Sequence, residues 1–262
     1  MKRFIIGLAG THGTGKTTLL QAAKAKGIPV DESQLSRTAQ TLLGWESLKP
    51  AQESQENMWA LQDAILEAMS IRDSKINASG IATLVDRTPA DVWGYTHLWI
   101  TRLGADKVDA DRIRDYYQKC FTLATAYRVQ IIVPIREEIP FVEQPNRADV
   151  QSRLFHARTV DDFIFGNGFE HCFIRSLSVE DRVNDLLSIM YKDMIKDVTE
   201  RAAATLKTFV DEVTPDFRTT MIEAAESWLK KFPPAQQIIF RNYLTSSDVM
   251  LQINNALIPK TM

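Results

Sequence analysis

The sequence predicts an α/β protein in which helices cover both faces of a parallel sheet, followed by a small helical unit at the C-terminus. Strand-like and helical segments alternate through about residue 190, which is typical of βαβ units in a doubly wound sheet. A glycine-rich turn directly follows the first strand-like segment. Strand signals stop after about residue 193, and only helical segments follow. Periodicity alone does not predict the order of the strands.

Five elements are expected in the first third of the chain. Phe4–Ala9 is an apolar run typical of a buried strand, and Lys16–Lys26 is a helix that a glycine ends. Ile28–Val30 is a short apolar stretch that leads into two acidic residues. Glu53–Ile76 contains no glycine or proline and has apolar residues at helical spacing, and Ile81–Val85 is a second clear strand.

The alternation continues through the middle of the chain. Pro89–Leu103 is expected to be a helix with proline at its first position, and Asp109–Arg128 another. Val129–Ile135 is a β-branched run that predicts a strand, Arg147–Phe165 is helical, and His171–Ile174 is a last short strand.

The C-terminal part of the chain has helical patterns and no strand-like segment. Ser178 to Asp181 resembles a capping box that opens a helix through Met190. The segments that follow are all helical in pattern, broken by prolines: Asp193–Val213, Pro215–Lys231, Pro234–Leu244 and Asp248–Leu257. We therefore predict a core over residues 1–192 and a helical C-terminal unit over residues 193–262.

Composition limits the function classes. The 262 residues have 45% hydrophobic and 24% charged residues and a formal charge of -2, so most of the chain should fold and no global basic excess exists to bind nucleic acid. Two widely separated cysteines have no metal-ligand spacing. The apolar run near the N-terminus is only six residues long, and no later run reaches the ~18–20 residues of a membrane span. We expect a cytosolic protein without a membrane partner.

The turn after the first strand carries the strongest motif in the chain. It matches G-x-x-x-x-G-K-[ST] without a gap, in the residues Gly10, Thr11, His12, Gly13, Thr14, Gly15, Lys16 and Thr17. Glycines let the backbone wrap closely around a polyphosphate, and the N–H groups of the loop and of the following helix supply positive potential. The context of a strand before and a helix after distinguishes the motif from an ordinary glycine-rich turn.

Individual residues of this motif have distinct expected roles. The Lys16 ammonium, expected to face solvent in the phosphate cradle, can reach the β- and γ-phosphates of ATP, and the Thr17 hydroxyl can bind Mg²⁺. Thr18 adjoins this site but is interpreted as a helix surface or packing residue. His12 occupies a variable position, and we interpret it as a solvated loop histidine that is also able to contact a nucleotide.

Acidic residues follow two predicted strands. Asp86 and Arg87 follow one strand, and Asp31 and Glu32 follow another. Ligands bind beyond the carboxyl ends of the strands in an open α/β sheet. A carboxylate there can hold Mg²⁺ or accept a proton from an attacking hydroxyl, and Arg87 can clamp an anion. Asp86 is thus a candidate metal ligand, and its structural alternative is an ion-paired surface turn.

The stretches Gly10–Thr18 and Asp86–Tyr95 resemble AAA-type P-loop kinases, including nicotinamide-riboside kinase domains and deoxynucleoside and thymidylate kinases, with bacteriophage members. The resemblance covers roughly residues 3–190. It implies a P-loop NTPase three-layer sandwich and places a catalytic carboxylate at Glu32, or else at Asp31. The acid–arginine pair of such kinases corresponds to Asp86 and Arg87.

The resemblance also implies a mobile lid that carries arginines, which corresponds loosely to Arg147–Arg158. Arg153 lies in the middle of this segment and is our candidate to close over phosphates. The interleaved acidic residues leave open a charged, solvated helix. Trp93 is the best candidate among nearby aromatic residues to stack on a base, although aromatic residues at helical spacing more often form core.

Three functions remain open at this point. The first is an ATP- and Mg²⁺-dependent kinase of a nucleoside- or nucleotide-like acceptor. The second is a kinase of a hydroxymethylated base within DNA, as in bacteriophages, although the tail has no basic run. The third is a non-kinase P-loop ATPase that acts as a switch, which the absence of a second acid after Asp86 disfavours. The acceptor, the preferred triphosphate and the oligomeric state are not predicted.

Overall fold

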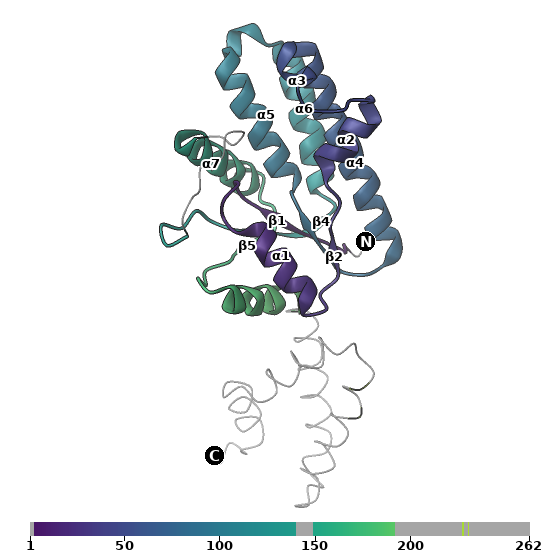
Figure 1. Cartoon of the computed structure of the whole chain (residues 1–262), viewed down its shortest axis with the longest axis vertical. Coiled ribbons are helices and arrows are strands. Elements are labelled where there is room, and N and C mark those ends of the chain that lie inside the picture. The colour runs from purple at the N-terminus through teal and green to yellow at the C-terminus, as the bar shows by residue number, and fades with distance from the viewer. Residues whose placement is uncertain (1–2, 140–148, 192–226, 228–229, 231–262) are drawn as a thin grey trace, which may run out of the picture. The chain divides into compact units, whose positions relative to one another are not determined.

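The computed structural model describes residues 3–139, 149–191, 227 and 230 (Figure 1). Its centre is a five-stranded parallel sheet in the order β2-β3-β1-β4-β5. The strands are β1 (Ile5–Ala9), β2 (Val30–Asp31), β3 (Thr83–Asp86), β4 (Tyr127–Ile132) and β5 (His171–Phe173). The predicted parallel α/β sandwich is confirmed, and the order places β1 between β3 and β4 at the middle of the sheet.

Helices connect the strands and cover the sheet. They are α1 (Lys16–Ala25), α2 (Leu35–Leu43), α3 (Pro50–Glu53), α4 (Gln55–Ser79), α5 (Pro89–Leu103), α6 (Ala110–Ala124) and α7 (Val150–Gly166). A 3₁₀ turn spans Ala105–Lys107, and residues 179–191 form a further helix. Helices α4, α5 and α6 gather on one side of the sheet in Figure 1, and α1 lies on the other.

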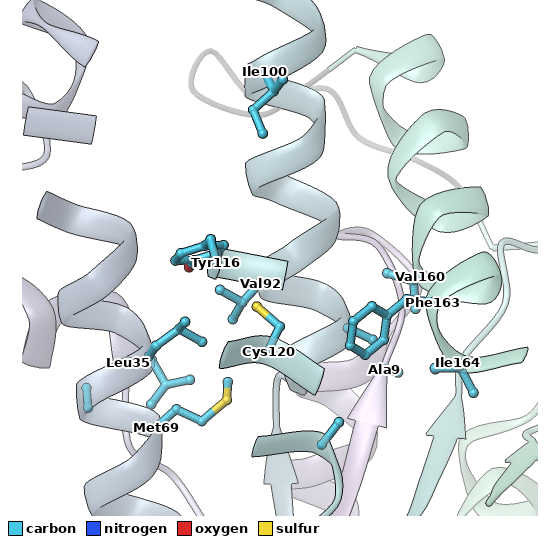
Figure 2. Close-up of a cluster of buried hydrophobic side chains, with 14 of the residues drawn as sticks. Ala9, Leu35, Met69, Val92, Ile100, Tyr116, Cys120, Val160, Phe163 and Ile164 are labelled. Carbon is cyan, nitrogen blue, oxygen red and sulfur yellow. The ribbon is translucent and has the colours of Figure 1, made fainter. Parts of the chain in front are cut away.

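A large buried cluster lies where α4, α5, α6 and α7 pack against the sheet. Figure 2 shows Val92 of α5, Cys120 of α6 and Phe163 of α7 converging there, with Ala9 from the end of β1. β1 is buried along its whole length, which explains its continuous apolar sequence, because a central parallel strand has helices on both faces. The packing buries the carboxyl end of β1, where the glycine-rich turn begins.

The boundary between α6 and β4 differs from the prediction. The helix ends at Ala124 and not at Arg128, and β4 begins at Tyr127 and not at Val129. The amides of Thr125 and Ala126 bond back to carbonyls of the last turn, and Tyr127 is buried and paired with Ile5 of β1. Pairing of β4 with β1 therefore places in a strand residues that the sequence predicted as the end of the helix.

Other boundaries are close to the predicted ones, but α2, the short α3 and the 3₁₀ turn were not predicted. Helix α5 has the predicted bounds. β3 begins at Thr83 because Gly80, with φ 67, ends α4 in a left-handed turn and leaves Ile81 exposed before the strand. Ser178 caps the helix over residues 179–191 through the amide of Asp181, as predicted, at 3.1 Å.

The chain divides into two compact units, Met1–Asp185 and Leu186–Met262. The helices predicted after Asp193, and the boundary between residues 192 and 193, lie outside the described residues. That division of the chain therefore stays a prediction. Within the described part, no helix is both long and apolar enough to span a membrane.

Candidate functional site

Two loops meet at the carboxyl edge of the sheet. β1 and β3 are neighbouring parallel strands, and Leu8 near the end of β1 pairs with Asp86 at the end of β3. The loop Gly10–Thr17 therefore leaves the sheet beside the turn at Asp86 and Arg87. This is the common edge that the sequence predicted for the glycine-rich motif and the acid–arginine pair.

The glycine-rich loop needs its glycines for physical reasons. Gly10 has φ 131, and a Cβ there would lie 2.6 Å from the Val133 carbonyl oxygen. Gly15 has φ 83 and packs against Arg182, whose Nη1 would lie 2.8 Å from an added Cβ. The Thr14 hydroxyl donates to the Thr11 carbonyl at 3.0 Å and closes the loop from inside. The backbone is thus shaped before any ligand arrives.

Lys16 lies inside this loop. Its ammonium donates to the carbonyls of Gly10 and Thr11, the second at 2.6 Å, and the side chain is only 5% exposed. The expectation that it faces solvent is wrong, because the carbonyls of the loop accept hydrogen bonds from the ammonium and the loop covers the side chain. Burial, followed by repulsion from Arg87, lowers the pKa of Lys16 to about 8, against the opposing effects of Asp91 and Asp86.

Asp91 joins the loop to the acid–arginine turn. One carboxylate oxygen accepts the Gly10 amide at 2.9 Å, and the other accepts the Thr88 amide at 2.9 Å and the Thr88 hydroxyl at 3.0 Å. The residue is fully buried. Sequence reasoning missed this role; the helix-capping pattern Thr88-Pro89-Ala90-Asp91 could have indicated the bonds to Thr88, but not the one to Gly10.

We expect Asp91→Asn to destabilise the protein and weaken nucleotide binding. The amide would set an N–H against the donors of Gly10 or Thr88 and would remove the negative charge beside Lys16 and Arg87. The free energy of unfolding should fall by about 1–3 kcal/mol, and ATP affinity about ten-fold. Melting and ATP titration measure these effects, with the exposed Asp115→Asn as control; equal behaviour of both variants would contradict the role.

Asp86 and Arg87 differ in backbone conformation and in the partners of their side chains. β3 ends at Asp86, and Arg87 has φ 68, the only positive φ outside glycine in the described residues, a conformation that costs roughly 1–3 kcal/mol. The Arg87 guanidinium donates to the Tyr95 hydroxyl at 2.9 Å and lies 4.0 Å from the Asp91 carboxylate. Asp86 Oδ1 is buried without a hydrogen-bond partner in the described structure.

Two histidines border this turn. His12, predicted to be solvated, is half-buried and its Nδ1 lies 3.3 Å from the Tyr95 hydroxyl. His156 of α7 is fully buried, contacts the Tyr95 ring and lies with Nε2 3.1 Å from the Asp91 carbonyl oxygen. Burial, with repulsion from Arg87, lowers the pKa of His156 to about 3 despite the Asp91 hydrogen bond.

His156 should make stability depend on pH. The unfolded side chain binds a proton near the ordinary value of 6.5, whereas the folded one does so only near 3, so stability is full above 6.5 and falls with pH below it. At pH 5 the loss should be about 2 kcal/mol. Urea unfolding of the wild type and of His156→Gln between pH 7 and 5 tests this, and the Gln variant should show a smaller loss. Parallel curves would contradict it.

Arginines from distant parts of the chain approach the loop. Arg153 of α7 is buried and donates from Nε to the His12 carbonyl at 3.2 Å, so this candidate does reach the loop. Of the other lid arginines, Arg158 is exposed and lies 3.8 Å from Asp162, as a solvated helix predicts, and Arg147 lies outside the described residues.

Arg182, which sequence reasoning missed, donates to the Thr14 carbonyl at 3.1 Å from the last described helix. Burial and the neighbouring Arg136 lower its pKa. Arg182 and Arg136 each have a buried Nε without a hydrogen-bond partner in the part of the chain that the structure describes. Two adjacent cations with unsatisfied donors favour an anion beside Gly15.

The other predicted residues lie further from this centre. Glu32 is exposed and pairs with Lys24 at 2.5 Å, while Asp31 accepts the Ser33 amide at 2.9 Å in a local turn. Thr17 and Thr18 are exposed at the start of α1. Trp93 packs edge-on against Tyr117, with ring centres 5.0 Å apart, which matches the alternative of helix packing.

The comparisons with known proteins agree with this fold. Residues 5–182 match the family described as AAA domain, whereas no curated protein matches the chain. Deoxyadenosine kinase from M. mycoides, solved with the products dCMP and dCDP, is 14% identical with a TM-score of 0.52, over 72% of this chain and 99% of that one. NadR, solved in complex with NR, is 12% identical with a TM-score of 0.50, over 72% of this chain and 51% of that one.

The strand order, the glycine-rich loop and the helix that follows it define an α/β protein with the fold of the P-loop kinases. The chain belongs to the AAA domain family, whose match extends from the first strand to Arg182. The predicted resemblance is therefore confirmed for family and fold. At 12–14% identity, the solved structures add the fold alone.

Proposed function

We propose that the protein is an ATP- and Mg²⁺-dependent phosphotransferase that acts on a nucleoside- or nucleotide-like acceptor. The observation that carries this proposal is the meeting of Lys16, Asp86 and Arg87 at one sheet edge, with a buried Asp86 oxygen that has no hydrogen-bond partner in the described structure. The nucleotides in the solved relatives of similar fold support the same class of ligand.

The triphosphate would bind along the glycine-rich loop. The Lys16 ammonium would exchange the carbonyls of Gly10 and Thr11 for phosphate oxygens, which explains a lysine held inside the loop. The N-terminus of α1 adds the positive end of its dipole. Arg182 and Arg136 would face the same nucleotide with their unsatisfied donors, and Arg153 would act from above the loop at His12.

The residues present fit a magnesium ion between the phosphates and the sheet edge. No group of three or more acidic, histidine or cysteine side chains that could hold a metal exists among the described residues, and Mg²⁺ needs none, because it uses one or two protein oxygens together with substrate phosphates. Thr17 and Asp86 would supply those oxygens. When bound, the ion neutralises charge on the transferred phosphoryl group.

The acceptor would lie on the other side of Asp86. Arg87, held by Tyr95, presents a cation to an acceptor anion or to the charge that develops in transfer. Phosphoryl transfer to a hydroxyl needs a nearby carboxylate that accepts the proton of the hydroxyl or orients the hydroxyl for attack. Asp86 is better placed than Glu32, because Glu32 is exposed and already paired with Lys24.

A screen with γ-labelled ATP tests the proposal. The protein is incubated with Mg²⁺ and, in separate reactions, with nucleosides, nucleotides or duplex DNA that contains hydroxymethylated bases. Label in a nucleoside or nucleotide supports the proposal. Label in DNA would favour the polymer kinase, and rapid release of inorganic phosphate without any acceptor would favour the switch ATPase.

A further inference from the structure

A buried arginine behind the acid–arginine turn has no role in the proposed site so far. Arg72 of α4 donates from Nη1 to the carbonyl of Asp86 at 2.9 Å and from Nη2 to the carbonyl of Arg87 at 3.4 Å. Nη2 also donates to the Tyr127 hydroxyl at 2.6 Å, and Nε donates to the Asp73 carboxylate at 2.8 Å. One guanidinium thus binds two successive carbonyls of the turn.

This contact matches an unusual backbone. Arg87 has the left-handed backbone conformation, which L residues rarely adopt and which is usually found at glycine. Such a conformation persists only where the surroundings over-determine it. The planar, forked donors of Arg72 reach both carbonyls at once, whereas a lysine ammonium is a point charge that lacks this geometry.

Two neighbours complete the arrangement. Asp73 neutralises the Arg72 charge through the Nε contact, and the Tyr127 hydroxyl of β4 accepts a hydrogen bond from Nη2 of the same guanidinium. Gly7 in β1 makes room, because a Cβ there would lie 2.4 Å from Thr88 and 2.8 Å from the Tyr127 ring. The three side chains are at least nine-tenths buried, and α4, β1 and β4 all contribute to the support of one turn.

We infer that Arg72, Asp73 and Tyr127 form a positioning network that holds the Asp86–Arg87 turn in its left-handed conformation. The network acts through the turn, because these four hydrogen bonds of Arg72 reach backbone carbonyls and its two buried partners, and none of the four reaches the glycine-rich loop. It thereby sets where the Asp86 carboxylate and the Arg87 guanidinium point. The inference rests on the proposed function for its catalytic consequence, but not for its structural one.

The test is Arg72→Lys, with Arg112→Lys as a matched control. Like Arg72, Arg112 forms an ion pair with an aspartate of α4, which is Asp63 in this case, and it also lies over the Trp59 ring. Arg112 does not bind the Asp86–Arg87 turn in these contacts. Loss of the fork should lower turnover with the acceptor by about 10–100-fold and raise the KM for the acceptor. The KM for ATP should stay within about two-fold, since the loop is untouched. The control should retain wild-type constants.

Amide hydrogen exchange supplies a readout that does not need activity. In Arg72→Lys, residues 86–91 should exchange about ten-fold faster, with β4 and α1 unchanged. Tyr127→Phe, a milder variant, should show the same local effect to a smaller degree. Wild-type exchange at the turn, or faster exchange across the whole domain, would overturn the inference. If the exchange result holds but no acceptor is phosphorylated by the wild type, the proposed function fails and the positioning role stands.

Discussion

Lys16→Ala should reduce phosphoryl transfer about a thousand-fold, because its ammonium is the cation closest to the backbone that would hold the phosphates. The side chain is held by two loop carbonyls within the same loop. Its removal withdraws the charge stabilisation that this ammonium would supply. Turnover is measured with labelled ATP and the acceptor that the screen identifies.

Buried Lys16 makes a folding control necessary. Lys16→Ala opens a cavity and leaves the carbonyls of Gly10 and Thr11 without their donor. Lys16→Met also lacks the donor but fills most of the volume, so it should melt closer to the wild type while remaining equally inactive. The exposed Lys26→Ala in the same segment should behave as the wild type. Normal turnover of Lys16→Ala, with a normal melting curve, would refute the nucleotide site altogether.

Asp86→Asn and Arg87→Lys should affect different kinetic constants, because Asp86 would bind Mg²⁺ and Arg87 would face the acceptor. Asp86→Asn keeps size but removes charge, so turnover should fall and the Mg²⁺ requirement rise, with little change in the acceptor KM. Arg87→Lys keeps charge but loses the fork that binds the Tyr95 hydroxyl. It should chiefly raise the acceptor KM and leave the ATP KM nearly intact.

The expected cost of each change is about 1.5–3 kcal/mol, or about one to two decades in rate or affinity. Lysine tolerates the left-handed conformation no better and no worse than arginine does, so backbone strain does not differ between the two. Magnesium titrations and separate KM values for ATP and acceptor distinguish the variants. A larger loss for Glu32→Gln than for Asp86→Asn would instead assign the catalytic carboxylate to Glu32.

Much of the site was predictable because local sequence determines it. A glycine-rich turn between an apolar run and a helix can be recognised in the sequence, since its glycines and lysine serve the same short stretch of backbone. The position of Asp86 and Arg87 at the same edge followed from their place after a strand in a parallel sheet. The order of the strands, which makes β1 and β3 neighbours, did not follow, because it depends on packing between distant segments.

Only the tertiary structure revealed the contacts that hold this edge together. Asp91 bonds the Gly10 amide across 81 positions of sequence, and Arg182 reaches Thr14 across 168. No periodicity or motif specifies such pairs, because each side chain is an ordinary helix residue until the sheet brings it to the loop. The family, the α/β class and the glycine-rich loop could be recognised in the sequence, because each is marked by local patterns of residues. The folded chain alone decided that Lys16 is buried, that Arg87 is left-handed and that Arg72 supports it, because burial and strain arise from long-range packing.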